Sequence, residues 1–564
     1  SGISRYDGDD SIYPIVADSD GKVILGYDES TDKMFGPGII TDEDLSEIQK
    51  TSPSNKELSL SGISRYDSDD ASIYPIVVDD DGKIVLGYNN NEDSLFGVGI
   101  VVEKDISSNK ELSESGISRY DGDDSIYPIV ADSDGKVILG YDESTDKMFG
   151  LLSTDIGANY AYEDSDFSLE MRFAKLNYFL TYGQSLSVGD KGTPVISAVQ
   201  PFNNVTFAGG VRGGNSGTYD YSALVPLIEA GSVPNPSFGE TPCSGAANYA
   251  TLLAAEENGV APNEHVILSS APGRAGARIN QISKGTPWYT GHLIEHFNRA
   301  KALEPDLNVQ AVMWLQGESD SGASGQPLLN KEQYLAAFMA LVSDINTDAR
   351  AITGQDTPVI FLSYQHSTYV TQSSAATQLA MLDAQKQSDL VYVITPTYHL
   401  PHVTDRLHLS AVGYKWIGAY FGRAYKQIMH DRIKPRAIQP VSSIHRGDTI
   451  RVRFKVPVSP LVLDNVSIPA TKDYGFLVTS DGNTATILKI NVENGNTIVI
   501  KTASVLYGNV VVRYALDYNG ANLASGASGN LRDSCPDTVV IDGSERTMYY
   551  VSPHFQLTSV KGEI

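Results

Sequence analysis

Three side chains in the middle of the chain have the types that nucleophilic catalysis needs. Ser185 follows the apolar segment YFLTYG (178–183), and Asp405 and His408 lie in TDRLH at 404–408. A serine hydroxyl attacks a carbonyl only when a base removes its proton, and histidine is that base when its ring is held in one tautomer. The D-x-x-H spacing lets Asp405 hold His408 from within one turn. The three residues therefore predict a Ser–His–Asp triad.

Acyl transfer also needs hydrogen-bond donors for the negative charge that develops on the carbonyl oxygen. The backbone amide of Ser185 is one candidate donor, and the glycine-rich stretch FAGGVRGG (207–214) supplies further amides. The side-chain amide of Gln316, in WLQGESD (314–320), is a third candidate.

Alternating apolar strands and helices follow from about residue 171. Five buried strands are predicted at 175–182, 265–270, 309–315, 358–364 and 390–395. Helices are predicted near 246–257, 288–303, 331–347, 373–387 and 411–429. This alternation is typical of a parallel sheet with helices on both faces, whose ligand site lies at the carboxyl ends of the strands. Ser185 and the segment with Asp405 and His408 each follow such a strand.

Taken in order, YGQSLS, the glycine loop, WLQGESD and DRLH resemble the four sequence blocks of the SGNH (GDSL-like) hydrolases. The QGESD form, together with GETPCSGAANYA (239–250), is similar to the sialate O-acetylesterase branch of the carbohydrate esterases. The resemblance covers about 171–430. It implies a flavodoxin-like α/β fold and hydrolysis of an O-acetyl ester without a metal or other cofactor.

The resemblance also implies roles for single residues. Ser185 would be the nucleophile, His408 the base and Asp405 the group that orients it. The oxyanion hole would consist of Ser185, Gly210 (or its neighbour Gly209) and Gln316, which stands where many members of the superfamily have Asn. Further candidates for substrate contacts are Gly209, Arg274, Glu318 and His402. For Arg274 a structural salt bridge is the alternative, and for His402 a structural role.

Two histidine patterns offer rival interpretations. HLIEH at 292–296 matches the H-x-x-E-H zinc motif, but no third ligand follows at a characteristic position. His399, His402, Asp405 and His408 occur at three-residue steps, which is also compatible with metal binding. We favour a role in the cleft for the second group and an amphipathic helix for the first. The two cysteines, Cys243 and Cys535, are expected to be buried thiols.

A repeat dominates the first 150 residues. The segment 1–36 returns letter for letter at 115–150, and a diverged copy lies at 61–97. In each copy two short strands flank a DSDG or DDDG turn, which predicts a β-hairpin. A single hairpin buries too little apolar surface to be stable alone, so we expect the repeats to pack on partner chains. A monomeric array of small β modules is the alternative.

Charge and composition limit the partners. The net charge is −27, and most of it lies in the repeats, so nucleic acid is not expected as a partner. No apolar stretch is long enough for membrane insertion. After 436 the strands become short and are separated by Asn, Asp and Gly, which is typical of a small β-sandwich. The predicted organisation is three repeats (1–150), a connector (151–170), the esterase domain (171–436), the β-sandwich (437–530) and a C-terminal β tail (531–564).

Acidic repeats that lead into a glycan esterase resemble a bacteriophage tail fibre or tailspike. This resemblance implies a homotrimer in the virion tail, outside the cell, that removes acetyl groups from a bacterial surface polysaccharide (O-antigen or capsule). The N-terminal region would bind other tail proteins. Two alternatives stay open: a secreted bacterial sialate or xylan acetylesterase, and a non-catalytic glycan-binding adhesin on an esterase fold.

Overall fold

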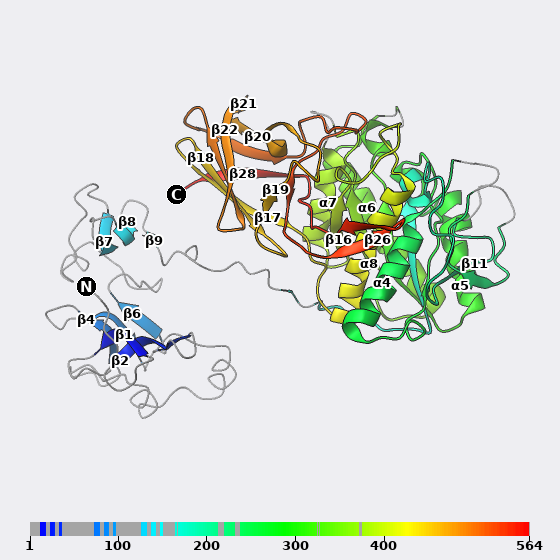
Figure 1. Ribbon diagram of the computed structural model, residues 1–564, viewed down its shortest axis with the longest axis horizontal. Helices are drawn as coiled ribbons and strands as arrows, with labels where there is room; N and C mark the ends of the chain where they lie inside the picture. The colour runs from blue at the N-terminus through cyan, green and yellow to red at the C-terminus, as the bar shows by residue number, and fades with distance from the viewer. Residues whose placement is uncertain are drawn as a thin grey trace. The chain divides into compact units, whose positions relative to one another are not determined.

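The computed structural model describes the backbone of nine strands before residue 151 and most of the chain from residue 164 onward (Figure 1). The described stretches in the second part are 164–165, 167–212, 219–231, 237–323, 325, 327–370 and 375–562. The connector predicted at 151–170 therefore lies largely outside the described residues. The chain divides into two compact units, Ser1–Ala158 and Asn159–Ile564.

The first unit contains three small antiparallel sheets, one in each repeat. Each has three strands, one more than the predicted hairpin, because the short segment that ends the repeat pairs with the second strand. The sheets consist of β1 Ile12–Ala17, β2 Val23–Asp28 and β3 Lys33–Phe35; β4 Ile73–Val78, β5 Ile84–Asn89 and β6 Ser94–Gly97; and β7 Ile126–Ala131, β8 Val137–Asp142 and β9 Lys147–Gly150. The register is the same in all three, with tyrosine opposite tyrosine and a shift after the proline.

A seven-stranded sheet forms the first half of the second unit. Its order is β12-β11-β13-β10-β14-β15-β16, and all neighbours are parallel except the pair β11 and β12. The strands are β10 Leu176–Gly183, β11 Val205–Phe207, β12 Leu224–Pro226, β13 Ile267–Leu268, β14 Leu307–Leu315, β15 Ile360–Gln365 and β16 Val391–Pro396. The five predicted strands take the order 2-1-3-4-5, which is the flavodoxin-like order. The short edge strands β11 and β12 were not predicted.

Helices cover both faces of this sheet, as the alternating pattern predicted. The helices are α4 Pro242–Asn258, α5 Glu295–Leu303, α6 Lys331–Thr353, α7 Ala376–Gln387 and α8 Ala411–Lys426. Phe179 of β10 packs in the core beneath α4 and α8, whereas Tyr178 and Leu180 face the core shared with α5, α6 and α7. Helices α4 and α8 approach closely, since a Cβ at Gly418 would lie 2.4 Å from the carbonyl oxygen of Pro242.

An eight-stranded sheet forms the second half of this unit, in the order β21-β20-β24-β28-β17-β18-β23-β22. Its strands are β17 Gln439–Arg446, β18 Thr449–Lys455, β20 Phe476–Ser480, β21 Asn483–Thr484, β22 Ile487–Glu493, β23 Thr497–Thr502, β24 Val510–Tyr514 and β28 Phe555–Lys561. Alternate residues of both halves of the sheet enter one hydrophobic core. The segment 531–564, predicted as a tail, includes β28, which lies inside this sheet between β24 and β17.

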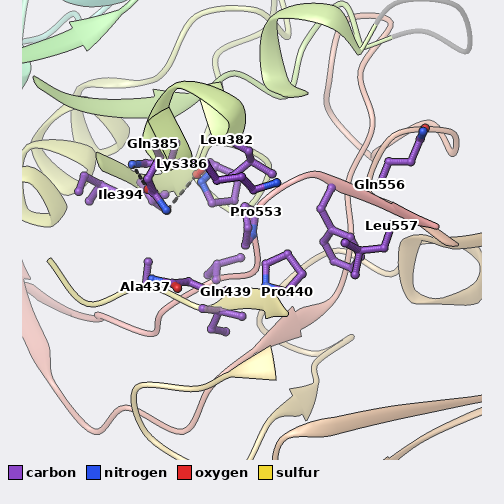
Figure 2. Close-up of a pocket in the computed structure, with 16 residues that line it drawn as sticks. Leu382, Gln385, Lys386, Ile394, Ala437, Gln439, Pro440, Pro553, Gln556 and Leu557 are labelled. Carbon is purple, nitrogen blue, oxygen red and sulfur yellow. Dashed lines mark hydrogen bonds between the residues drawn. The ribbon is translucent and has the colours of Figure 1, made fainter. Parts of the chain in front are cut away.

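The two halves of the second unit meet along α7 and β16 on one side and β17 and β28 on the other. Tyr398 donates a hydrogen bond to the carbonyl of Ser552 (2.7 Å), and Gln365 exchanges two with the backbone of His554. A pocket of about 120 Å³ remains between them (Figure 2). Figure 2 shows Leu382 and Lys386 on one side of it and Gln439 and Pro440 on the other.

Cys243 and Cys535 are both buried and unpaired, as predicted. In the part of the chain that the structure describes, no helix is long and apolar enough to cross a membrane.

Candidate active site

Ser185 stands on a tight turn at the carboxyl end of β10. The turn needs a glycine before it: Gly183 has φ +144°, and a Cβ there would lie 2.0 Å from the carbonyl oxygen of Leu315. The amide of Gln184 then donates to the same carbonyl (2.9 Å), and a short 3₁₀ helix, Ser185–Val188, begins. The turn lies between β10 and β14, where the order of the sheet reverses and where such folds bind ligands.

The structure brings Ser185, His408 and Asp405 into one hydrogen-bonded chain. Nε2 of His408 lies 2.8 Å from Oγ of Ser185, and Nδ1 lies 2.8 Å from Oδ2 of Asp405. Because a carboxylate only accepts, Nδ1 carries the proton and Nε2 is free to accept the proton of the serine hydroxyl. The hydroxyl, the imidazole and the carboxylate therefore have the geometry of a Ser–His–Asp triad.

Asp405 is held by the turn that it begins. Its Oδ1 accepts hydrogen bonds from the backbone amides of Leu407 and His408, both at 2.9 Å. Partial burial favours the neutral acid, but these hydrogen bonds and the one from the His408 ring outweigh it and hold the pKa of Asp405 below its usual range. The carboxylate is thus kept in the charged form that can stabilise an imidazolium.

The half of the unit that contains the eight-stranded sheet contacts the turn that carries Asp405 and His408. Arg406, between the acid and the base, has φ +62°; its carbonyl accepts from the amide of Ala524 (2.7 Å) and its guanidinium donates to the carbonyl of Leu523 (2.7 Å). The position of the triad's acid and base therefore depends on residues more than a hundred positions downstream. Sequence analysis did not predict this contact.

In the described residues, the predicted oxyanion donors of the glycine loop are hydrogen-bonded within the protein. The amide of Gly210 donates to the carbonyl of Phe207 (2.8 Å), and the amide of Gly209 donates to the carbonyl of Asp220 (2.8 Å). Both N–H groups are consumed by local turns, so neither is left for a substrate oxygen. This also removes Gly209 as a substrate contact through its amide. Residues 213–218, which contain the end of the glycine loop, lie outside the described residues.

Gln316 is likewise committed to the protein. Its Nε2 donates to Oδ2 of Asp320 (2.6 Å) and to the carbonyl of Ala277 (3.3 Å), while its Oε1 accepts from the hydroxyl of Tyr334 (2.7 Å). Asp320 is in turn held by Arg278. In this structure both N–H groups of Gln316 already have acceptors within the protein, so the geometry does not support the predicted oxyanion role.

Gln184 carries a side-chain amide next to the nucleophile that sequence analysis did not single out. Its Oε1 accepts from the amides of Gly317 (3.3 Å) and Ser319 (3.0 Å), which identifies this atom as the oxygen. Within the described stretches, Nε2 has no acceptor. The side-chain amide of Gln184 directly precedes the nucleophile and is held by hydrogen bonds to its oxygen. Its N–H groups are therefore available to a ligand. The only signal in the sequence was the Gln of GQS, which is common in capped turns.

Two of the predicted substrate contacts face the interior instead. Both carboxylate oxygens of Glu318 accept from the hydroxyl of Tyr364 (2.6 and 2.7 Å), and burial raises the pKa of Glu318 to about 7. Nδ1 of His402 donates to the carbonyl of Leu400 (2.9 Å), its Nε2 is buried, and burial lowers the pKa of His402 to about 4. Neither offers a polar atom to a substrate, so both predictions are corrected.

Arg274 lies beside the nucleophile turn. Its amide donates to the carbonyl of Gly183 (2.9 Å), and its exposed guanidinium lies over the ring of Trp288, 5.4 Å from the centroid. Trp288 is anchored by a hydrogen bond from its Nε1 to the carbonyl of Pro272 (2.9 Å). No carboxylate of the described residues lies within 4.0 Å of Arg274, which removes the predicted alternative of a structural salt bridge in this part of the chain.

The rival histidine patterns do not assemble a metal site in the described part of the chain. His296 is buried against Ser270 (2.9 Å) and Tyr178 (3.2 Å), whereas His292 stacks on Trp288. Among the residues that the structure describes, no three His, Cys, Asp or Glu side chains are grouped as metal ligands would be. His399, which was also expected in the cleft, has both ring nitrogens buried.

A Ser–His–Asp chain at the carboxyl ends of a parallel α/β sheet is the site of a hydrolase that acts through an acyl-enzyme. Comparison with known proteins points in the same direction. Residues 250–427 match the family model described as carbohydrate esterase, sialic acid-specific acetylesterase. The matched segment contains Asp405 and His408 and begins after Ser185. The match supports an esterase that acts on carbohydrates.

Three solved structures are similar to part of the chain. A carbohydrate acetylesterase from Xanthomonas citri is 15% identical with a TM-score of 0.42, over 67% of this chain and 80% of that one. A protein from Arabidopsis thaliana is 17% identical with a TM-score of 0.33, over 45% and 98% of the two chains. A third structure, of a carbohydrate esterase, is 11% identical with a TM-score of 0.24, over 46% and 72%. No curated protein sequence matches the chain.

The side-chain amide of Gln184 yields a prediction. In Gln184→Glu one carboxylate oxygen can still accept from Gly317 and Ser319, but the N–H donors are lost. We expect turnover of an acetyl ester to fall by about 10²-fold or more, the usual effect of removing one oxyanion donor. Steady-state kinetics with 4-nitrophenyl acetate measures this, and an unchanged melting temperature shows that the fold is intact. Turnover equal to that of the wild type would exclude Gln184 as a donor.

Proposed function

We propose that this protein is a carbohydrate O-acetylesterase. The observation that carries the proposal is the unbroken chain of 2.8 Å contacts from Ser185 through His408 to Asp405. The family match to carbohydrate esterases supports the carbohydrate as the alcohol part of the ester and acetate as the acid part.

The reaction takes place in two halves. His408 takes the proton of Ser185 as Oγ attacks the acetyl carbonyl, and the same ring returns a proton to the departing sugar oxygen. Asp405 stabilises the imidazolium between these steps. The amide of Ser185 and Nε2 of Gln184 are the donors that we assign to the oxyanion. Water then releases acetate from Ser185 with His408 again as the base.

Removal of the nucleophile tests the proposal. Ser185→Ala leaves His408 and Asp405 in place but deletes the attacking oxygen, so we expect turnover to fall by about 10⁴–10⁶-fold. Ser222→Ala, an exposed serine of the same unit, serves as the matched control and keeps full activity. Acetate released from acetylated glycans is the measurement. Near-normal release by Ser185→Ala would refute the assignment, whereas no release by the wild type would favour the non-catalytic adhesin.

We further propose that the substrate is an acidic bacterial surface polysaccharide. Arg274 supports this, since its guanidinium is exposed next to the nucleophile turn, lies over Trp288, and has no carboxylate partner in the described residues. An exposed guanidinium with no carboxylate partner in the described residues suits a sugar that carries a carboxylate.

Arg274→Ala should therefore affect binding rather than chemistry. We expect KM for an acetylated acidic polysaccharide to rise about tenfold, the value of a partly exposed charge-assisted hydrogen bond, with kcat nearly unchanged. With 4-nitrophenyl acetate, which has no carboxylate, both constants should stay at wild-type values. Arg299→Ala, an exposed arginine already paired with Glu295, is the control. An equal loss on both substrates would contradict a role in recognition.

The repeats suggest the setting of the enzyme. We propose that the chain is part of a bacteriophage tail fibre or tailspike, is a homotrimer, and contacts other tail proteins through its N-terminal region. The support is the threefold repeat of small sheets in one register and the concentration of negative charge before residue 151. Small three-stranded sheets bury little apolar surface by themselves, which favours association.

Light scattering on the full chain tests the trimer. We expect a single species with three times the mass of the chain. A monodisperse monomer over a range of concentrations would contradict the fibre and favour a secreted esterase.

A further inference from the structure

Asp190 is a carboxylate that stands beside the triad without belonging to it. It follows the short helix that begins with Ser185, and its amide donates to the carbonyl of Ser185 (3.1 Å). Its own carbonyl accepts from the hydroxyl of Tyr414 (2.7 Å), and its Oδ1 accepts from the hydroxyl of Ser237 (2.7 Å). Backbone and side chain are therefore both fixed relative to the nucleophile.

The second oxygen of Asp190 faces the catalytic base. Oδ2 lies 3.8 Å from Nε2 of His408, the same ring nitrogen that contacts Oγ of Ser185. This distance is too long for a direct hydrogen bond. In the described residues, no lysine or arginine lies within 4.0 Å of Asp190, and its side chain is 17% exposed. Oδ2 is thus an acceptor at the rim of the site that makes no ion pair with a lysine or arginine there.

The second half of the reaction needs an acceptor in this position. Once the acetyl group is on Ser185, Nε2 of His408 must accept a proton from water rather than from the serine. A water molecule has two protons, and it is held in one orientation only if both are bound. Two acceptors 3.8 Å apart are both within reach of one water, whose hydrogen bonds are each about 2.8 Å long.

We propose that Asp190 is the positioning residue for the water that hydrolyses the acetyl-enzyme, an inference that rests on the proposed esterase function. The water donates one hydrogen bond to Nε2 of His408 and the other to Oδ2 of Asp190. Its oxygen bonds to the acetyl carbon while the first proton passes to His408. The bond from that carbon to Oγ of Ser185 then breaks, His408 returns the proton to Oγ, and acetic acid leaves. No other reactant is required.

The role differs from that of the triad in the step that it affects. Acylation uses Oγ of Ser185 and Nε2 of His408 but no water, so loss of Asp190 should leave it nearly intact. Deacylation should become slower, because the water has lost its second acceptor. Binding of a sugar hydroxyl by Asp190 is a different role. The two roles are distinguished with an ester whose leaving group has no hydroxyl besides the reacting oxygen, because such a substrate offers Asp190 no sugar hydroxyl to bind.

The experiment follows both halves of one turnover with 4-nitrophenyl acetate in a stopped-flow instrument. For Asp190→Asn, in which a donor can replace the acceptor, and for Asp190→Ala, we expect the rate constant of the first release of 4-nitrophenol to stay within about threefold of wild type. The steady-state rate should fall by about 10²-fold, the loss that misplacement of a reacting group by about 1 Å can cause. Intact-mass spectrometry of the quenched reaction should show one added acetyl group, absent in Ser185→Ala.

The controls keep the outcome specific. Asp389→Asn removes an exposed carboxylate that pairs with Lys434 and should leave both phases unchanged. If either Asp190 variant fails to fold, Ser237→Ala, which frees Oδ1 but keeps the carboxylate, should show a smaller loss confined to the steady state. Equal loss in both phases, or no loss in either, would overturn the role of Asp190. Absence of any acetyl-enzyme in wild type and variants alike would instead count against the esterase mechanism itself.

Discussion

The hydrogen bond between Nδ1 of His408 and Asp405 is the interaction on which the site depends. It determines which ring nitrogen carries the proton, and so leaves Nε2 free to face Ser185 at 2.8 Å. The turn that carries both groups has a left-handed residue, Arg406, at its centre. Such a conformation costs about 1–3 kcal/mol and persists only where the surroundings hold it. Here the backbone at 523–524 does so.

Through the contact of residues 523–524 with Arg406, the C-terminal half of the unit positions the acid and base of the triad but takes no part in the reaction. Leu523 and Ala524 belong to a loop of that half. Strand β28, which begins at residue 555, pairs with β24 inside the sheet of the same half. The nucleophile turn, in contrast, is held within the first half of the unit, where Gly183 allows β10 to approach Leu315. The nucleophile and the turn that carries the acid and base are therefore held by different halves of the unit. The interface near Tyr398 and His554 must keep the two halves correctly placed relative to each other.

The oxyanion donors illustrate how a motif can predict a region but not an atom. The glycine loop and WLQGESD lie near the predicted edge of the sheet. However, Gly210 donates its N–H to Phe207, and Gln316 donates to Asp320. The amide left over is that of Gln184. Whether an N–H is free depends on the carbonyl or carboxylate that faces it, and that partner is contributed by another part of the chain.

The order of the elements and the identity of the three reacting groups can be recognised in the amino-acid sequence. Buried parallel strands are apolar on both faces, so their positions are visible in the letters, and a serine, a histidine and an aspartate at strand ends point to acyl transfer. Tertiary structure alone decided that Glu318 and His402 face the interior, that Arg406 is braced from the second sheet, and that Asp190 stands 3.8 Å from the base. Those outcomes depend on which segments far apart in the chain come into contact, and no local stretch of the sequence encodes such contacts.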